Sequence, residues 1–300
     1  MKVWIDGNIV EGKDARLSVT DHGFLYGDGV FEGMRAYNGR LFRLEDHLRR
    51  LEVSSRTIQL EIPGGIDHVR DVVLRTVAAT GSADAYIRLL VTRGEGPLGV
   101  DPTTCPQPKL ICIVDTVDLF PAERAARGVD IVTATLRRPS ADVLDPRVKS
   151  LNYLNNVLCK GEARRRGADD ALMLNQQGAV AECTGANIFA VLGGVVSTPL
   201  TTDGALDGIT RRTVLELCGT LGIEARERTL GRVDFFAADE AFLTGSGARV
   251  VPVRSLDSQP IGHAKAQTPG PVTQRLTEAF FEFARSTGTP VPYPAARAAG

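Results

Sequence analysis

Short apolar segments joined by glycine turns recur along this 300-residue chain and restrict the folds that it can adopt. The segments are rich in β-branched residues, as strands are, and two such runs separated by a tight turn pair antiparallel. Clear examples are VWIDGNIV at the N-terminus, ALMLNQQGAVAE, NIFAVLGGVVSTP and DEAFLTGSGARVVPV. Segments with helical periodicity separate them, so the pattern predicts an α+β fold.

The helical segments carry apolar residues at helical spacing and suitable residues at their ends. We expect helices from about Leu44, from a cap at Asp67 to about Thr80, and over Leu151–Arg166, Thr210–Leu221 and Pro271–Ser286. In the helix over Leu151–Arg166, one apolar face is formed by Leu151, Leu154, Leu158 and Ala163.

A segment with Pro and Gly near its edges, DLFPAERAARG, divides the chain. We expect a small N-terminal α/β domain over residues 1–117, an interdomain linker over 118–128 and a large C-terminal domain over 129–300. The last residues, TGTPVPYPAARAAG, have the composition of a loosely ordered tail.

The composition of the chain limits the classes of partner that it can bind. The net charge of −1 gives no field for nucleic acid or an anionic membrane. Apolar runs such as LICIV and IFAVLGGVV are too short to span a bilayer, and the N-terminus has no apolar signal segment. We therefore expect a cytoplasmic protein. The five cysteines lack a Cys-x-x-Cys pair and the four histidines are scattered, which favours buried thiols and no metal site.

Lys149, in RVKSLNYLNN, is an unusual residue for this chain. Of 35 basic residues only six are lysines, at positions 2, 13, 109, 149, 160 and 265, and the other 29 are arginines. A partly buried lysine can lose its proton and attack a carbonyl, which arginine cannot do. A plain surface lysine remains the alternative at this point.

Three further segments could hold a ligand. GALDGITRRTVLEL opens a helix at about Thr210, whose N-terminal N–H groups suit a phosphate, although Thr210 could be an ordinary cap. LTGSGARVV could bring Ser246 to an anion or be a simple hairpin. Glu182 could pair with a cationic nitrogen or be an exposed carboxylate in a turn.

One cofactor accounts for all of these groups. Pyridoxal 5′-phosphate needs a lysine for its aldehyde, an anion cradle for its phosphate and an acid for its ring nitrogen. The Gly-x-Gly stretches RGEGPLG and YGDGVFEG do not indicate a dinucleotide instead, because neither lies between a strand and a helix.

The chain resembles the class IV aminotransferases of fold type IV, and among them most closely the branched-chain amino acid aminotransferases. The resemblance lies in DHGFLYGDGVFEGMRAYNGRLFRLEDHLRRL, AYIRLLVTRGEGPLGVDP, VKSLNYLNNVL, AECTGANIFAV, LDGITRRTV and LTGSGARVVPV, in this order over nearly the whole chain. It implies a two-domain fold like that of D-amino acid aminotransferase, with pyridoxal 5′-phosphate between the domains.

The resemblance also implies roles for single residues. Lys149 would hold the cofactor covalently and shuttle the substrate proton, and Glu182 would keep the pyridine nitrogen protonated. The remaining cofactor contacts would be Arg50, Ile209, Thr210 and Ser246 at the phosphate, Leu206 on the ring and Tyr153 near the phenolic oxygen. The substrate carboxylates would meet Tyr86, Arg88 and the turn at Ser246–Gly247, and the side-chain pocket would be formed by Phe31, Gly33 and Tyr26.

The same resemblance implies a homodimer with the site at the interface, Tyr26 coming from the partner subunit, and ping-pong transfer from leucine, isoleucine or valine to 2-oxoglutarate. This chain departs from the family pattern in two places. The family's Gly-Thr-Ala-Ala-Glu turn is here Gly245-Ser246-Gly247-Ala248-Arg249, which leaves the preferred amino-group acceptor open. In addition, Glu182 is followed by Cys183-Thr184. The alternatives are a D-amino acid or (R)-amine transaminase, an aminodeoxychorismate lyase and a non-catalytic homologue that binds the cofactor.

Overall fold

The computed structural model describes residues 1–116, 122–262 and 268–293, and the chain forms two compact units. Unit 1 contains Met1–Val117, Lys149–Asn152 and Ala284–Gly300, and unit 2 contains Asp118–Val148 and Tyr153–Phe283. The predicted linear division differs from these units in three places: Lys149–Asn152 and the segment from Ala284 belong to unit 1, and the expected linker belongs to unit 2. Where a linker was expected, Ala122–Arg127 forms helix α4, which contacts strand β14 (Arg249–Leu256) of unit 2.

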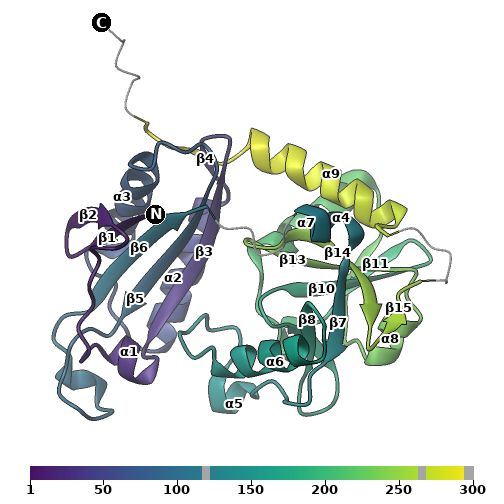
Figure 1. Ribbon diagram of the computed structural model, residues 1–300, viewed down its shortest axis with the longest axis horizontal. Helices are drawn as coiled ribbons and strands as arrows, with labels where there is room; N and C mark the ends of the chain where they lie inside the picture. Colours follow the sequence, from purple (N-terminus) through teal and green to yellow (C-terminus); the bar gives the residue numbers. More distant parts are fainter. Residues whose placement is uncertain (117–121, 263–267, 294–300) are drawn as a thin grey trace, which may run out of the picture. The chain divides into compact units, whose positions relative to one another are not determined.

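Unit 1 is built on one sheet with the strand order β16-β4-β3-β5-β6-β1-β2 (Figure 1). The strands are β1 (Lys2–Ile5), β2 (Asn8–Glu11), β3 (Gly29–Tyr37), β4 (Arg40–Leu41), β5 (Ala85–Thr92), β6 (Lys109–Asp115) and β16 (Thr289–Pro290), and all of them pair antiparallel. The helices are α1 (His22–Tyr26), α2 (Leu44–Thr57) and α3 (Gly65–Ala78). The expected α+β class is confirmed.

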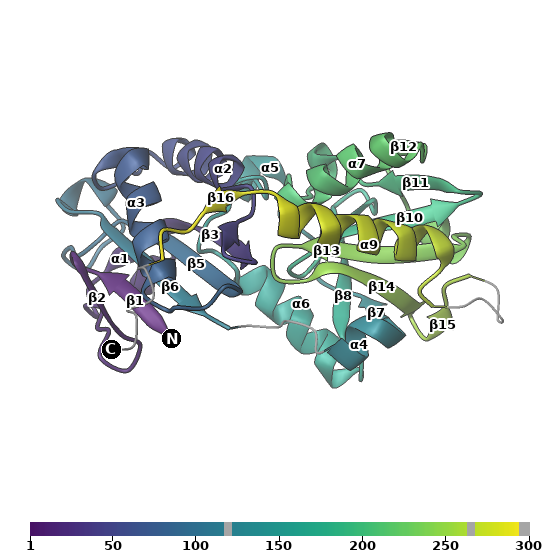
Figure 2. The same ribbon diagram turned by 90° about the horizontal axis from the view of Figure 1, so that it is seen from above.

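Strand alternation gives the sheet of unit 1 two different faces. Val30, Met34 and Ala36 of β3 join Ile87 and Leu89 of β5 in a buried core with the apolar residues of α2 and α3. Both helices therefore cover the same face of the sheet, as Figure 2 shows. The intervening residues of β3 and β5 lie on the other face and include several of the predicted site residues.

Unit 2 contains a mixed sheet with the order β12-β11-β10-β13-β14-β7-β8-β9, and β15 pairs with β14. The strands are β7 (Val129–Thr133), β8 (Asp170–Leu174), β9 (Val180–Cys183), β10 (Asn187–Leu192), β11 (Val195–Thr198), β12 (Ala225–Glu227), β13 (Glu240–Gly245), β14 and β15 (Gln259–Pro260). The hairpins predicted from the glycine turns are confirmed, whereas β7 runs parallel to both of its neighbours.

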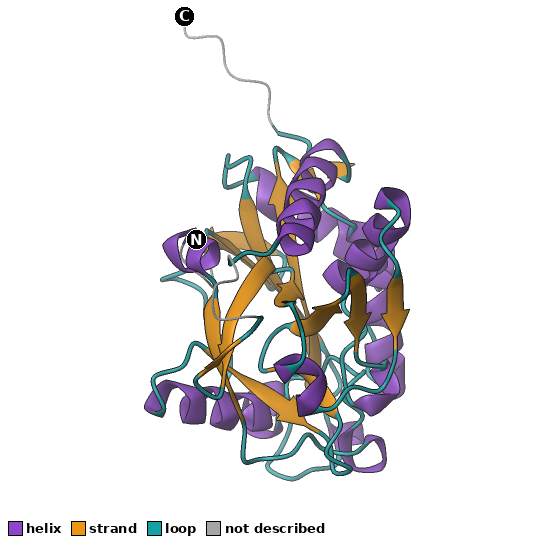
Figure 3. Cartoon of the chain, turned by 90° about the vertical axis from the view of Figure 1, so that its right-hand side faces the viewer, coloured by secondary structure: helices purple, strands orange, loops and turns teal. Residues whose placement is uncertain are grey.

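The helices of unit 2 are α4, α5 (Ala141–Leu144), α6 (Leu154–Arg165), α7 (Ile209–Leu221), α8 (Arg232–Phe236) and most of α9 (Pro271–Ser286). They appear in purple beside the orange strands in Figure 3. Two short 3₁₀ turns, Pro102–Thr104 in unit 1 and Thr201–Asp203 in unit 2, complete the regular elements of the described ranges. Helix α3 begins at Gly65 with Gly64 as its cap, so the prediction that Asp67 caps it was wrong.

Helix α6 differs most from its prediction. It begins at Leu154 rather than Leu151, because Leu151 N donates to Gly29 O at 2.9 Å and Asn152 Nδ2 donates to Gly27 O at 2.9 Å. The predicted apolar face is mostly exposed: Leu154 is 68% and Leu158 is 49% accessible. Of that face, Ala163 is buried, and together with Cys159 it packs on β7 and β8; Asn156 is buried as well.

All five cysteines are buried free thiols, as the sequence predicted. Within the described residues, no helix is both long enough and apolar enough to cross a bilayer.

Candidate functional site

Lys149 belongs to a short segment that joins unit 1 and pairs with the beginning of β3. Lys149 O accepts a hydrogen bond from Phe31 N at 2.9 Å, and Ser150 forms a bridge with Val30. Lys149 N donates to Ser54 Oγ of α2 at 3.2 Å. The side chain is half-buried, and its Nζ lies 4.4 Å from the centre of the Phe31 ring. The backbone of the residue is thus fixed on both sides, and the amine lies against an aromatic surface.

Arg50 lies in a buried ionic cluster with Glu32 and His47. Its Nε and Nη2 donate to the two oxygens of Glu32 at 2.7 and 2.8 Å, and His47 Nδ1 lies 2.7 Å from Glu32 Oε2. Glu32 and His47 are almost inaccessible and Arg50 is 9% exposed. The bidentate contact with Glu32 fixes the plane of the guanidinium.

The charges of this cluster change its ionisation. Burial alone would raise the pKa of Glu32, but the charges of Arg50 and His47 and their hydrogen bonds outweigh burial and hold the pKa far below its usual value. Burial lowers the pKa of His47, and the nearby Arg50 and Lys149 lower it further, against the opposing effect of Glu32. Glu32 is therefore ionised at neutral pH.

The sheet face opposite α2 and α3 brings four of the predicted substrate residues together. Gly33 is paired with Arg88 across β3 and β5. The guanidinium of Arg88 lies 4.5 Å from the Phe31 ring centre, and its Nη2 donates to the Tyr86 hydroxyl at 3.0 Å. A Cβ at Gly33 would lie 2.6 Å from that hydroxyl, so this position has room only for glycine as the side chains stand.

Tyr26, at the end of α1, is 38% exposed. Its hydroxyl accepts a hydrogen bond from Gly99 N at 2.9 Å, in the loop between β5 and β6. The contact ties the ring to unit 1, where it remains accessible to a ligand or to another protein chain.

Glu182 is a buried carboxylate of β9 in unit 2, only 5% exposed, so the alternative of an exposed turn residue was wrong. Arg138 Nη2 donates to its Oε1 at 2.5 Å. Its Oε2 accepts from Asn187 Nδ2 at 3.0 Å and from Leu206 N at 3.1 Å. These N–H donors orient the carboxylate and favour its ionised form.

The N-terminus of α7 closely follows Leu206. Gly208 is the cap residue and supplies no side-chain hydrogen bond, and Ile209 is the first residue of the helix. Thr210 is 3% exposed and lies inside the first turn, so it is not the cap. The first N–H groups of this helix therefore lack a side-chain cap within the described residues, as an anion-binding helix terminus requires. Asn187 donates to both Glu182 and Leu206 and so connects the two features.

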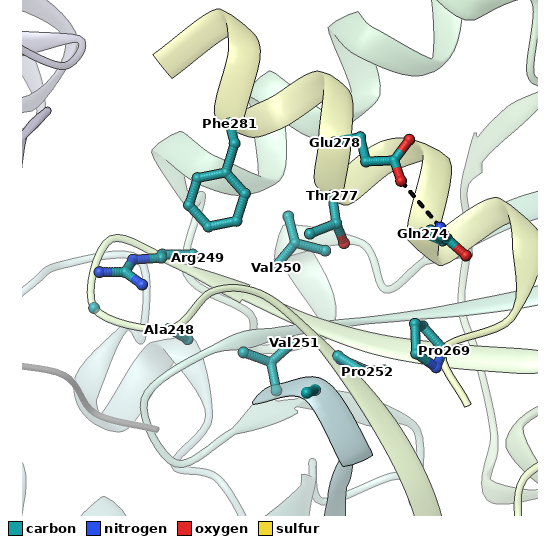
Figure 4. A pocket seen from close by; sticks show the side chains of 12 residues that line it. Ala248, Arg249, Val250, Val251, Pro252, Pro269, Gln274, Thr277, Glu278 and Phe281 are labelled. Atoms are coloured by element: carbon teal, nitrogen blue, oxygen red, sulfur yellow. Dashed lines mark hydrogen bonds between the residues drawn. The ribbon is translucent and has the colours of Figure 1, made fainter. Parts of the chain in front are cut away.

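Ser246 and Gly247 lie in the loop of a hairpin, because β13 and β14 pair up to Gly245 and Arg249. Both residues are half-buried. A cavity of about 440 Å³ adjoins this loop on the side of α9 (Figure 4). Among the described residues, Arg249 is the one basic side chain in its lining, and it lies 5.7 Å from the Phe281 ring centre. Arg249, which stands where the family turn has Glu, thus lies at the wall of this cavity.

Tyr153 is half-buried and takes the cap position of α6, and it contributes no side-chain hydrogen bond to the helix end. Sequence reasoning assigned no role to Glu32, His47, Arg138 or Asn187. His47 and Arg50 have the spacing of helical neighbours and could have been paired from the sequence. Asn187 lies five positions from Glu182, whereas the contacts of Arg138 and of Glu32 join residues farther apart in the chain and left no local signal.

Comparison with known proteins agrees with these features. The profile of amino-transferase class IV matches residues 29–256. A putative branched-chain-amino-acid aminotransferase of Methanocaldococcus jannaschii is 44% identical over 291 residues, covering 97% of this chain and 99% of its own length. The crystal structure of Escherichia coli branched-chain amino acid aminotransferase has a TM-score of 0.90 at 32% identity, covering 96% of this chain and 95% of that one.

A further crystal structure shows a branched-chain amino acid aminotransferase complexed with N-(5′-phosphopyridoxyl)-L-glutamate. It has a TM-score of 0.88 at 34% identity and covers 95% of this chain and 94% of its own. The family profile covers most of the chain, and it includes Lys149, Glu182, the start of α7 and the loop at Ser246. This chain belongs to the class IV aminotransferases.

Proposed function

We propose that this protein transfers the amino group of a branched-chain L-amino acid to 2-oxoglutarate, with pyridoxal 5′-phosphate as cofactor. The observation that carries the proposal is Lys149, a half-buried amine held by backbone contacts to β3 and α2. The names of the similar solved structures support the branched-chain substrate.

The residues present fit the cofactor by their chemistry. A phosphate needs N–H donors and a positive end, which the uncapped start of α7, the Ser246 hydroxyl and the Arg50 guanidinium provide. An ionised buried acid, Glu182, suits a protonated ring nitrogen. A Cβ at Gly208 would lie 1.9 Å from Asn187 Oδ1, so glycine at this position keeps the helix end close to the Glu182 network. Leu206 and Tyr153 are assigned to the ring and its phenolic oxygen.

The bound cofactor would supply a carbonyl for amines and a ring that accepts electrons from the substrate. Lys149 would hold the cofactor through that carbonyl until the substrate amine displaces it. Its released Nζ would then take the proton from the substrate Cα and deliver it to the carbon of the former carbonyl, and only a neutral amine can take that proton. Glu182 stays ionised and stabilises positive charge on the ring nitrogen. Phe31 packs against Lys149 Nζ and limits the solvent around it.

Substrate recognition is assigned to the open face of the sheet in unit 1 and to the loop of unit 2. Arg88 meets the distal carboxylate of glutamate or 2-oxoglutarate, and Tyr86 with Ser246–Gly247 receives the α-carboxylate. Phe31, Gly33 and Tyr26 surround the aliphatic side chain. One similar enzyme carries a phosphopyridoxyl group joined to L-glutamate, which supports glutamate as one of the substrates.

A homodimer in the cytoplasm is part of the proposal. Leu154, Val157 and Leu158 lie on one face of α6 and are 68%, 60% and 49% exposed. An apolar face of this kind is usually covered by another protein surface. Tyr26, also exposed, is assigned to the site of the partner subunit. Light scattering of the purified protein measures the assembly, and a monomer at working concentration would contradict this part.

The experiment that tests the chemistry has two parts. Reduction of the protein with borohydride should attach the cofactor covalently to Lys149, and a Lys149→Ala variant should lose at least about a thousandfold in kcat. Full turnover by Lys149→Ala, or no adduct in the wild type, would refute a lysine-bound cofactor.

Specificity is measured separately with L-leucine, D-alanine and an (R)-arylamine as donors, each with pyruvate and 2-oxoglutarate. We expect the highest kcat/KM for L-leucine with 2-oxoglutarate. A preference for D-alanine or for the arylamine would instead assign the chain to the other transaminases of this fold.

A further inference from the structure

Arg138 of unit 2 is a buried arginine without a part in the proposed chemistry. It is 6% exposed and follows β7. Its Nε donates to Gly204 O at 3.2 Å, its Nη1 to Asn156 Oδ1 at 2.9 Å and its Nη2 to Glu182 Oε1 at 2.5 Å. Three nitrogens of one planar group thus have three different acceptors, so the guanidinium cannot rotate without breaking at least one contact.

The anchors of Arg138 are themselves fixed. Asn156 lies on the buried side of α6, and its Nδ2 donates to Thr184 O at 2.8 Å. Gly204 lies just before the segment that leads to Leu206. Arg138 therefore links β9, α6 and the approach to α7, and both side chains that it contacts are almost inaccessible to water. A buried charge pair whose hydrogen bonds are all formed keeps its side chains in one arrangement.

The contacts also determine the charge of Glu182. A carboxylate that is removed from water is stable as an anion only where positive charge and N–H donors replace the water. Arg138 supplies the positive charge, while Asn187 and Leu206 supply neutral donors. Without Arg138 the carboxylate would keep only the neutral donors among these contacts and would bind a proton more readily.

We infer that Arg138 is a positioning residue that holds Glu182 ionised and correctly oriented, so that the proton shared with the cofactor stays on the ring nitrogen. The inference rests on the proposed function, because it needs the ring nitrogen to lie against Glu182. Arg138 itself touches neither the substrate nor the reacting atoms in this scheme. Its effect on turnover is transmitted entirely through the Glu182 carboxylate.

The test uses holoenzyme reconstituted with cofactor that carries ¹⁵N in its ring, and it compares the wild type with Arg138→Gln and Arg138→Lys. In the wild type, the ¹⁵N chemical shift should be that of a protonated ring. In Arg138→Gln it should move toward the neutral ring at the same pH, and kcat should fall about tenfold to a hundredfold with KM for L-leucine nearly unchanged. Arg138→Lys keeps the charge but not the three-way contact. Its ¹⁵N shift and kcat should therefore lie between those of the wild type and those of Arg138→Gln.

A matched control separates this effect from a loss of stability. Arg93 of unit 1 is 7% exposed, pairs with Asp28 at 2.9 and 3.0 Å and donates to two backbone carbonyls. Arg93→Gln should lower the melting temperature and leave the ¹⁵N signal in place. A signal that moves equally in both glutamine variants would overturn the inference.

Two further outcomes are decisive. A folded Arg138→Gln protein with the wild-type ¹⁵N shift would overturn the role of Arg138 while leaving the proposed function intact, provided that borohydride still labels Lys149. If Arg138→Gln does not fold, Arg138→Lys carries the test, and a wild-type shift and kcat in that variant would show that orientation by Arg138 is not needed. An unlabelled wild type would refute the proposed function itself.

Discussion

At the scale of single residues, the cluster of Glu32, His47 and Arg50 shows how a cationic group can be kept in place inside a protein. Glu32 has no access to solvent, yet it stays ionised because Arg50 approaches it with two N–H groups. Arg50 gains a fixed orientation in return. If Arg50 binds the cofactor phosphate as proposed, its fixed orientation means that it loses less conformational entropy when the phosphate binds.

Glu32→Gln tests this cluster. Removal of the carboxylate leaves Arg50 buried without its anion, so we expect a loss of about 3 kcal/mol in the free energy of unfolding at pH 7. The pKa of Glu32 is lowered in the folded protein from an ordinary value of 4.5. Its contribution is therefore complete above about pH 5 and decreases as the pH falls below 4.5 toward the folded-state pKa. Denaturant unfolding of both proteins from pH 7 to pH 3 measures the difference.

Glu45→Gln is the matched control. Glu45 also forms a bidentate pair, with Arg70 at 2.8 and 2.9 Å, but its side chain is 57% exposed. An exposed pair contributes little, so this variant should lose less than about 1 kcal/mol. Equal losses in the two variants, or a Glu32→Gln difference that grows below pH 4.5, would contradict the assigned role of burial.

The sequence supported some of these residue assignments and not others. Lys149 could be proposed as the nucleophile because an arginine-rich chain uses lysine rarely, and attack on an aldehyde requires an amine. Arg138 could not be identified in the same way, because it is one of 29 arginines and its acceptors lie 18, 44 and 66 positions away. Which arginine meets which carboxylate is decided by tertiary packing.

At the scale of elements, α6 shows how much of a helix can be predicted from the periodicity of its apolar residues. Leucines at helical spacing correctly predicted a helix, but they do not tell which surface covers them. In this chain Cys159 and Ala163 face the sheet, while Leu154 and Leu158 face outward. The start of the helix was misplaced for a related reason, since the backbone of Leu151 is hydrogen-bonded to β3.

Gly208→Ala is the prediction for α7. A Cβ at this position would lie 1.9 Å from Asn187 Oδ1, and Asn187 holds both Glu182 and Leu206. The amide must move, which disturbs the carboxylate and the helix end together. We expect the dissociation constant of pyridoxal 5′-phosphate to rise at least about tenfold, which corresponds to about 1.4 kcal/mol, as measured by fluorescence titration of the apoprotein.

Gly219→Ala serves as the control in the same helix. A Cβ there meets no atom within 4 Å among the described residues, and alanine favours a helix over glycine. Its cofactor affinity should be unchanged, and its stability should rise by about 0.5–1 kcal/mol. If Gly208→Ala binds the cofactor as tightly as Gly219→Ala does, Asn187 does not transmit the disturbance.

At the scale of the whole molecule, the dimer proposal can be tested by mixing two inactive proteins. If Tyr26 acts in the site of the partner subunit, a mixed dimer of Tyr26→Ala and Lys149→Ala has one site with both changes and one with neither. Co-refolded mixtures should then recover about a quarter of the wild-type activity for random pairing, measured as kcat per total subunit. The two variants refolded alone provide the baseline.

No recovery in the mixture, with mixed dimers demonstrated by differently tagged subunits, would place Tyr26 in the site of its own subunit. Variants of the α6 face address the interface itself. Leu158→Glu introduces a charge on that exposed face and should shift the protein toward monomers in light scattering.

The passage of Lys149–Asn152 through unit 1 has a consequence for protein engineering. Lys149, the proposed nucleophile, is encoded between two segments of unit 2, but its backbone segment is paired with Phe31 and Gly29. In a chimera that takes residues 1–117 from one relative and the remainder from another, the lysine segment would therefore pair with a β3 strand that comes from the other protein. Exchange of unit 1 between such enzymes should be planned with three crossover segments, so that the lysine travels with the strand that holds it.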